Sequence, residues 1–162
     1  MRQSLSETTR RPAVAPGGVS HRNGAGAGLL LGALALSAAL AGAAFVDQAG
    51  GRSLMDHAHD VYAGHGASPS AGVVYGLVYT VAALGVLLWL GTLAGARAGR
   101  RWAVWAAVVV TVVMAGLAVT LLAASEYGEQ VYPPFWGILA LLSPLVGALG
   151  VVPLAKHRAR QD

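Results

Sequence analysis

The sequence predicts an all-α integral membrane protein, in which four transmembrane helices form an up-down-up-down bundle and a short amphipathic helix lies in the first outer loop. Four stretches, residues 25–46, 71–96, 102–124 and 135–155, contain no Asp, Glu, Lys, Arg or His. Each is long enough to cross the hydrocarbon core of a bilayer, which takes about 20 residues of helix. The composition agrees, because 56% of the residues are hydrophobic and 11% are charged, which lies outside the usual balance of a soluble domain.

Basic residues set the predicted orientation, because short cytoplasmic loops carry the excess of Lys and Arg. Such residues precede the first span, separate the second from the third and follow the fourth, whereas Arg52 alone lies on the other side. We therefore expect both termini in the cytoplasm, outer loops at residues 47–70 and 125–134, and an inner loop at residues 97–101. The scattered basic residues are explained by the membrane, so no nucleic-acid partner is predicted.

The ends of the chain are predicted to be tails on either side of a transmembrane domain at residues 25–155. Residues 1–24 have almost no bulky apolar side chains, which predicts a disordered cytoplasmic tail. Residues 156–162 form a short cytoplasmic tail at the C-terminus. An alternative makes residues 1–43 a cleaved signal peptide, although the apolar run is longer than a typical h-region. Ten arginines against one lysine resemble the codon bias of a high-GC bacterium, which favours a bacterial plasma membrane.

The first span carries Gly24, Gly28 and Gly32 at every fourth position, which places them on one helical face. Gly72 and Gly76 repeat this spacing at the start of the second span. Small residues let helix backbones approach closely in lipid. These glycines are therefore predicted to pack helices together, either within the bundle or against a second copy or another membrane protein.

Aromatic side chains of the spans are expected near the two membrane interfaces, which Trp and Tyr prefer. This preference places Trp89, Trp102 and Trp105 near the inner face. Tyr75 and Tyr79 lie one turn apart near the outer end of the second span. Their hydroxyls are expected to bond between helices or to their own backbone, and the alternative is that they line an outward-facing crevice.

The first outer loop contains a predicted helix at residues 53–62. Ser53 is its expected N-cap, with Asp56 three residues later in a variant of the capping box, and Gly64 is expected to end it. The apolar face of this helix is predicted to hold Leu54, Met55, Ala58, Val61 and Tyr62.

The polar face of the same helix holds Asp56, His57, His59 and Asp60. A solvated surface is the commoner explanation of such a pattern. The alternative is a divalent metal site, because imidazole and carboxylate are natural ligands of zinc and related metals. No recognised motif such as H-E-x-x-H is present, and no other cofactor is predicted.

Two further features concern the third and fourth spans. Glu126 and Glu129 follow the third span, where carboxylates oppose the helix dipole. An ion pair with Arg52 is expected to compensate, and the alternative is a bound cation or a protonated His57 or His59. Gly128 is expected to terminate that helix. Pro144 is expected to kink the fourth helix by freeing the carbonyl of Ala140. Ser143 is predicted to help satisfy that freed backbone group.

The spans lack the ionisable residues that usually mark proton relays and ion paths. The sequence therefore favours a non-enzymatic structural or accessory subunit of a membrane, in contact with the lipid bilayer. The two alternatives are a component of a small-molecule or ion transporter and an outward-facing metal-binding sensor or enzyme.

Overall fold

Residues 20–159 are described by the computed structural model of the protein, and within them four helices are long and apolar enough to span a membrane. These helices are α1 (Ser20–Ala49), α3 (Ala71–Arg97), α4 (Ala103–Ala123) and α5 (Pro134–Arg158). The 21 residues of α4 rise about 1.5 Å each, which gives about 30 Å, the thickness of a bilayer's hydrocarbon core. The predicted set of four apolar helices, each able to cross a membrane, is confirmed.

Two boundaries differ from the expected ones. α1 already begins at Ser20, whereas a tail was expected through residue 24, and residues 1–19 of that tail lie outside the described residues. α5 continues through Lys156 to Arg158, where the C-terminal tail was expected to have begun. Cations in the last turn of a helix are favourable because they face the negative end of its dipole.

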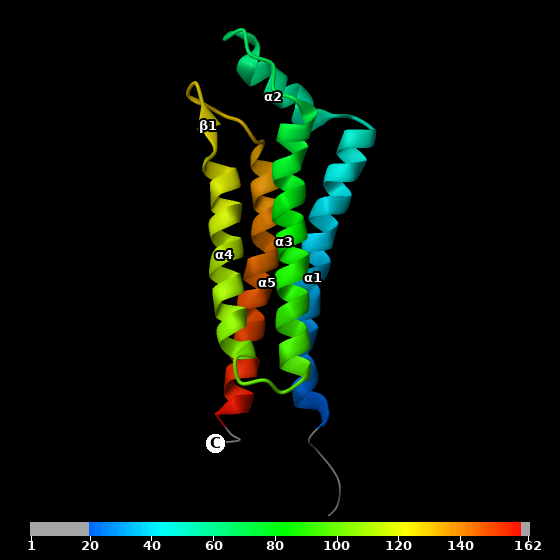
Figure 1. The fold of residues 1–162 in the computed structure, drawn as a ribbon, viewed down its shortest axis with the longest axis vertical. Coiled ribbons are helices and arrows are strands. Elements are labelled where there is room, and N and C mark those ends of the chain that lie inside the picture. Colours follow the sequence, from blue (N-terminus) through cyan, green and yellow to red (C-terminus); the bar gives the residue numbers. More distant parts are fainter. Residues whose placement is uncertain (1–19, 160–162) are drawn as a thin grey trace, which may run out of the picture.

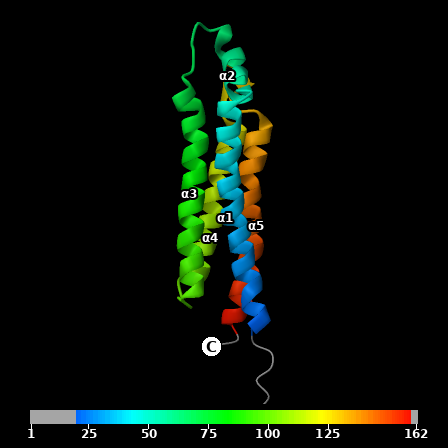
Figure 2. The same cartoon turned by 90° about the vertical axis from the view of Figure 1, so that its right-hand side faces the viewer.

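The four long helices form a ring, in which α1 and α4 each pack against both α3 and α5 (Figure 1, Figure 2). Both described ends of the chain lie at the same end of the ring as the loop between α3 and α4, which we call the tail end. The opposite end carries α2 (Ser53–Ala63) and a hairpin of β1 (Ser125–Glu126) and β2 (Glu129–Gln130). We call this opposite end the cap end.

The tight turn at the tail end is a glycine-dependent helix stop. Gly99 has a φ of +64°, and its N–H donates to the carbonyl of Ala96. The N–H of Arg100 donates to the carbonyl of Gly95. This pair of hydrogen bonds is a Schellman motif, which needs a left-handed residue after the helix and favours glycine there.

The hairpin at the cap end corrects the role expected for Gly128. α4 ends at Ala123, and Gly128 lies in the turn between β1 and β2 with a φ of +87°. Its neighbour Tyr127 has a φ of +55°. Two consecutive residues with positive φ are typical of a type I′ turn, whose twist matches that of a hairpin. Gly128 therefore reverses the chain and does not end the helix.

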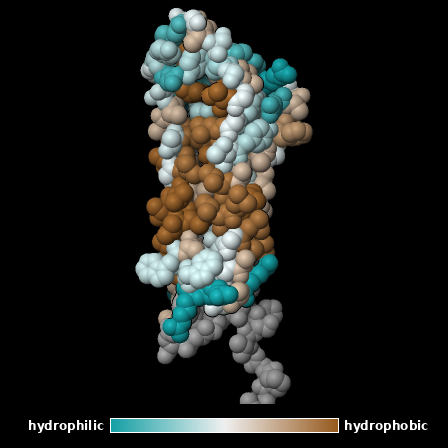
Figure 3. Space-filling view, viewed as in Figure 1, coloured by the Kyte–Doolittle hydropathy of each residue, from teal (hydrophilic) through white to brown (hydrophobic). Residues whose placement is uncertain are grey.

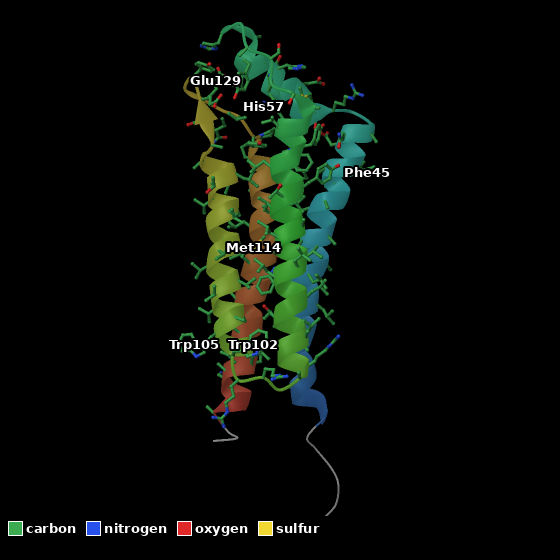
Figure 4. All side chains as sticks on the ribbon, viewed as in Figure 1. Phe45, His57, Trp102, Trp105, Met114 and Glu129 are labelled. Atoms are coloured by element: carbon green, nitrogen blue, oxygen red, sulfur yellow. The ribbon has the colours of Figure 1, made fainter. Side chains whose placement is uncertain are left out.

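The ring buries large apolar side chains, among them Leu30, Trp89, Met114 and Leu121, while other apolar side chains point outward. Val112 is 67% exposed and Trp105 is 74% exposed, both on α4. Apolar residues form a belt around the middle of the face drawn in Figure 3, with hydrophilic residues at both ends. Phe45 and Trp105 project away from the ring (Figure 4). Such a surface suits a lipid environment.

Close helix approaches occur mostly at glycines other than the predicted ones. Apart from the adjoining residues and the backbone of the same helix turn, no described heavy atom lies within 4 Å of the position that a Cβ would take at Gly28, Gly72 or Gly76. Gly32 does face a neighbour, because its Cβ would lie 3.3 Å from Cγ1 of Val146. The surroundings of Gly24 lie outside the described residues. The tightest approaches are instead at Gly85, Gly95, Gly137 and Gly147.

Gly147 gives the first prediction, because a Cβ there would overlap the fully buried ring of Trp89. We expect Gly147→Ala to lower the free energy of unfolding by about 1–3 kcal/mol, the usual cost of overpacking a core. The measurement is unfolding in detergent micelles followed by circular dichroism. Gly28→Ala is the matched control, and it should not lower the stability, because alanine favours a helix over glycine by about 0.5–1 kcal/mol and nothing blocks its Cβ there. Equal losses in the two variants would contradict the packing at Gly147.

Candidate functional site

The middle of the ring contains a buried polar group, which we call the serine–tryptophan network. It consists of Ser37 on α1, Trp89 on α3, Ser143 on α5 and the carbonyl of Ala33. Nε1 of Trp89 donates to Oγ of Ser143 over 2.9 Å, and the two serine Oγ atoms lie 2.8 Å apart. Both serine hydroxyls also lie within hydrogen-bond distance of the Ala33 oxygen.

The network has a consistent arrangement of protons. The indole and the two hydroxyls supply three hydrogens. They can run in one direction, from Trp89 to Ser143, from Ser143 to Ser37 and from Ser37 to the carbonyl of Ala33. Every buried donor then has an acceptor. Among the described residues, no buried side-chain nitrogen or oxygen lacks a hydrogen-bond partner.

Two of the close glycines leave room for this network. A Cβ at Gly85 would lie 2.5 Å from Oγ of Ser37 and 2.9 Å from Cε of Met114, and Gly147 lies against the ring of Trp89. The glycines therefore let the polar side chains of three helices meet, while α4 contributes Met114. With these positions occupied, the middle of the ring is a packed interior.

The network corrects two expectations from the sequence. Trp89 was expected near the inner interface, but its side chain is fully buried in the ring. Ser143 was expected to compensate the carbonyl freed by Pro144, but its hydroxyl instead contacts Ala33 on α1 and Ser37. Pro144 lies within α5 and is fully buried, and Pro153 is a second proline in the same helix.

The cap end is held to the ring by the carboxylate of Asp47, close to the end of α1. Oδ1 accepts from the N–H and the hydroxyl of Ser53, and Oδ2 accepts from the N–H of Leu54 over 3.1 Å. Oδ2 also accepts from the hydroxyl of Tyr75 over 2.7 Å. Asp47 thus caps the first turn of α2 and joins it to α1 and α3.

This arrangement corrects the predicted capping of α2. The residue before the helix is Arg52, in a left-handed conformation with a φ of +50°, and no side chain at this N-cap position makes a capping hydrogen bond. Ser53 is the first helical residue, so the cap comes from Asp47, six residues earlier in the chain. The helix is followed by Gly64, as expected.

The hydroxyls of Tyr75 and Tyr79 serve the interhelical role that was expected of them. Tyr75 is buried and donates to Asp47, and Tyr79 donates to Oε1 of Gln48 over 2.9 Å. Both bonds run from α3 to α1, so these side chains join two helices at the cap end. The threonines at 80, 92, 111 and 120 each donate to the carbonyl four residues earlier in their own helix.

The hairpin contacts α2 through aromatic and polar side chains. The Tyr62 hydroxyl donates to Oε2 of Glu126, so a tyrosine partners Glu126 where an ion pair with Arg52 was expected. Tyr127 meets the edge of Tyr62 and stacks on His65 with ring centroids 3.7 Å apart. The hydrogen bond to Glu126 raises the pKa of Tyr62 to about 12, because it favours the protonated phenol.

The residues of the suggested metal site all lie on α2. His57 lies with Nε2 2.9 Å from the carbonyl oxygen of Gln130 in β2, while Asp56, His59 and Asp60 are exposed. Within residues that the structure describes, no group of three or more His, Cys, Asp or Glu side chains is placed to hold a metal ion. The contact of His57 with the hairpin had no signal in the local sequence, because Gln130 is far along the chain.

The second prediction tests the serine–tryptophan network. Ser143→Ala should lower the free energy of unfolding by about 0.6–2 kcal/mol, because it leaves the indole N–H of Trp89 without its acceptor. Trp89→Phe removes the donor, so the double variant should cost clearly less than the sum of the two single variants. The measurement is a double-mutant cycle in detergent. Thr120→Ala, which alters a bond within one helix, is the control and should add to Trp89→Phe without coupling. If the losses of Ser143→Ala and Trp89→Phe simply added in the double variant, the network would be contradicted.

The third prediction concerns the phenol of Tyr62. Glu126→Gln should lower the pKa of Tyr62 from about 12 toward its ordinary value of about 10. The measurement is phenolate absorbance during alkaline titration, with Tyr62 isolated by subtracting the Tyr62→Phe spectrum. Because folding raises this pKa, the hydrogen bond stabilises the folded state fully below about pH 10. That stabilisation is lost as the pH rises through about 12 and the phenol ionises. Glu129→Gln is the control and should leave the pKa of Tyr62 unchanged.

No known protein provides a site that could be compared with that of this chain. No protein-family model, curated protein or solved structure matches the chain. The roles of its residues therefore follow from their own contacts, burial and charge.

Proposed function

We propose that the protein is a non-enzymatic structural or accessory subunit of a bacterial plasma membrane, with both termini in the cytoplasm. The observation that supports this proposal best is the packed middle of the ring. Trp89 is fully buried there, its indole N–H is bonded to Ser143, and Gly85 and Gly147 leave no space for a methyl group. A protein with such an interior would act through its outer surfaces.

Those surfaces offer two kinds of contact to a partner. On the helices, Gly28 and Gly72 have open space at the position of a Cβ, so a second chain could approach their backbones closely. At the cap end, Asp56, Asp60 and Glu129 are exposed carboxylates. The first kind fits a membrane helix of a second copy or of another protein, which is the association that we propose.

The proposed orientation follows from charge. Arg97, Arg100, Arg101 and Lys156 gather at the tail end, whereas most carboxylates lie at the cap end. Positively charged loops remain on the cytoplasmic side during insertion. The tail end is therefore the proposed cytoplasmic end, and α2 with the hairpin is proposed to face outward.

The fourth prediction tests this orientation with single cysteines, which is convenient because the chain contains none. Gly51→Cys at the cap end should react with a membrane-impermeant maleimide added to intact cells. Ala98→Cys at the tail end should react only after the membrane is opened. Both positions are exposed. The reverse pattern would overturn the proposed orientation.

The fifth prediction tests the role as a subunit with a photo-crosslinking amino acid in native membranes. Lipid-facing positions on each helix, Leu31, Leu87, Val112 and Leu145, are exposed and suit the label. A subunit should give a protein adduct of one defined mass from one face of the ring, because a specific partner covers one side. A co-expressed copy with a longer tag shows whether that adduct is a second copy. Adducts with lipid alone at all four positions would overturn the proposal.

A further inference from the structure

An apolar groove runs between α4 and α5 on the lipid-facing surface. Its lining consists of Val108, Thr111 and Val112 from α4 and Ala148 and Val151 from α5, and its volume is about 220 Å³. The one hydroxyl in this lining, that of Thr111, donates to the carbonyl of Ala107 over 2.8 Å. The groove therefore presents hydrocarbon surface with its polar group already paired.

The size of the groove and its position across the membrane suit a lipid chain. The groove is open on its outer side, and its volume of about 220 Å³ would hold part of one acyl chain lying along it. Thr111 lies eight residues inside the first residue of α4, and Ala148 lies eight residues before Lys156 of α5. At about 1.5 Å per residue, both lie about 12 Å from the tail end, within one leaflet of a core about 30 Å thick.

Positive charge lies at the level where the headgroup of that lipid would be. Lys156 lies eight residues after Ala148 in α5, about two turns closer to the tail end than the groove. Arg100 and Arg101 lie in the loop between α3 and α4 and are exposed, like Lys156. Lysine and arginine near a membrane surface attract anionic lipids.

We propose that this groove is a binding site for an anionic phospholipid. One acyl chain lies between α4 and α5 against Ala148, and the headgroup phosphate lies beside Lys156 and the arginines before α4. The occupant follows from the combination of a hydrocarbon groove and cations at its headgroup end. A partner helix would also fill the groove but would bring no phosphate to the cations near it, whereas an anionic phospholipid supplies both the hydrocarbon chain and the opposite charge. The site does not depend on the proposed role as a subunit.

The binding test uses the purified full chain in nanodiscs of equal palmitoyl-oleoyl phosphatidylcholine and phosphatidylglycerol, which share their chains and differ in headgroup charge. Native mass spectrometry counts the lipids that stay bound to the protein after it is released from the nanodisc. We expect one phosphatidylglycerol per chain, retained about fivefold over phosphatidylcholine. Equal retention of the two lipids would overturn the proposal.

Matched variants separate the groove from general attraction to the tail end. Lys156→Gln should abolish the fivefold preference, whereas Arg97→Gln, on α3, should change it by less than about twofold. Ala148→Phe should fill the groove and reduce the number of retained lipids. Ala83→Phe, on the exposed face of α3, should not. A preference that survives Ala148→Phe would show headgroup attraction without a groove site and would overturn the proposal.

A second measurement on the native sequence keeps the test decisive if Ala148→Phe does not fold. Trp105 is 74% exposed and lies one turn before Val108, beside the groove. Phosphatidylglycerol brominated on its acyl chain should quench Trp105 more strongly than brominated phosphatidylcholine in the same mixed bilayer. The fluorescence of Trp105 is obtained by subtracting the spectrum of the Trp105→Phe variant from that of the native protein. Equal quenching by the two lipids would contradict the site.

Discussion

The packing of the ring's interior depends on the hydrogen bond from the indole of Trp89 to the hydroxyl of Ser143. Lipid offers no partner to a buried N–H, so the donor must find its acceptor within the protein. α3 and α5 face each other across the ring with few direct contacts, and the indole reaches from one to the other. Ser143 then continues to α1 through the carbonyl of Ala33. Trp89 and Ser143 together thus connect three helices, and the buried indole fills space between them.

The cap end depends on a different kind of contact, a carboxylate that serves three elements at once. Asp47 lies in the last turns of α1, where it is close to the start of α2 and to Tyr75 of α3. Its acceptor sites are used by two backbone N–H groups and two hydroxyls. The buried face of α2, formed by Leu54, Met55, Ala58 and Val61, then covers this end of the ring. The polar contact positions the helix and the apolar face holds it there.

The sequence predicted the spans well because a helix in lipid needs only length and the absence of charge. It could not show which side of each span faces inward, since both the buried and the lipid-facing sides are apolar. The spacing of Gly28 and Gly32 therefore predicted a shared face without identifying its neighbour. Trp89 was placed at an interface for the same reason, although its nearest charged residue in α3, Arg97, is two turns away.

The missed contacts at the cap end have a different cause. Capping rules examine the residue at the start of a helix, whereas Asp47 acts on α2 from the end of α1. The pairing of Tyr62 with Glu126 joins residues 64 positions apart, which only the fold brings together. Short, strongly local features such as the end of α2 before Gly64 were predictable, because one residue and its own turn determine them.

With a packed interior, both of the proposed associations, with a lipid and with a protein partner, would use the outer surface of the ring. A convex apolar helix face gives a lipid chain no more contact than bulk lipid does, whereas a concave one surrounds the chain and gains dispersion contacts. Ala148 contributes only a methyl group to the lining, beside the larger side chains of Val108, Val112 and Val151. A lipid in this groove would occupy the face shared by α4 and α5. Gly28 and Gly72 belong to α1 and α3, neither of which lines this groove.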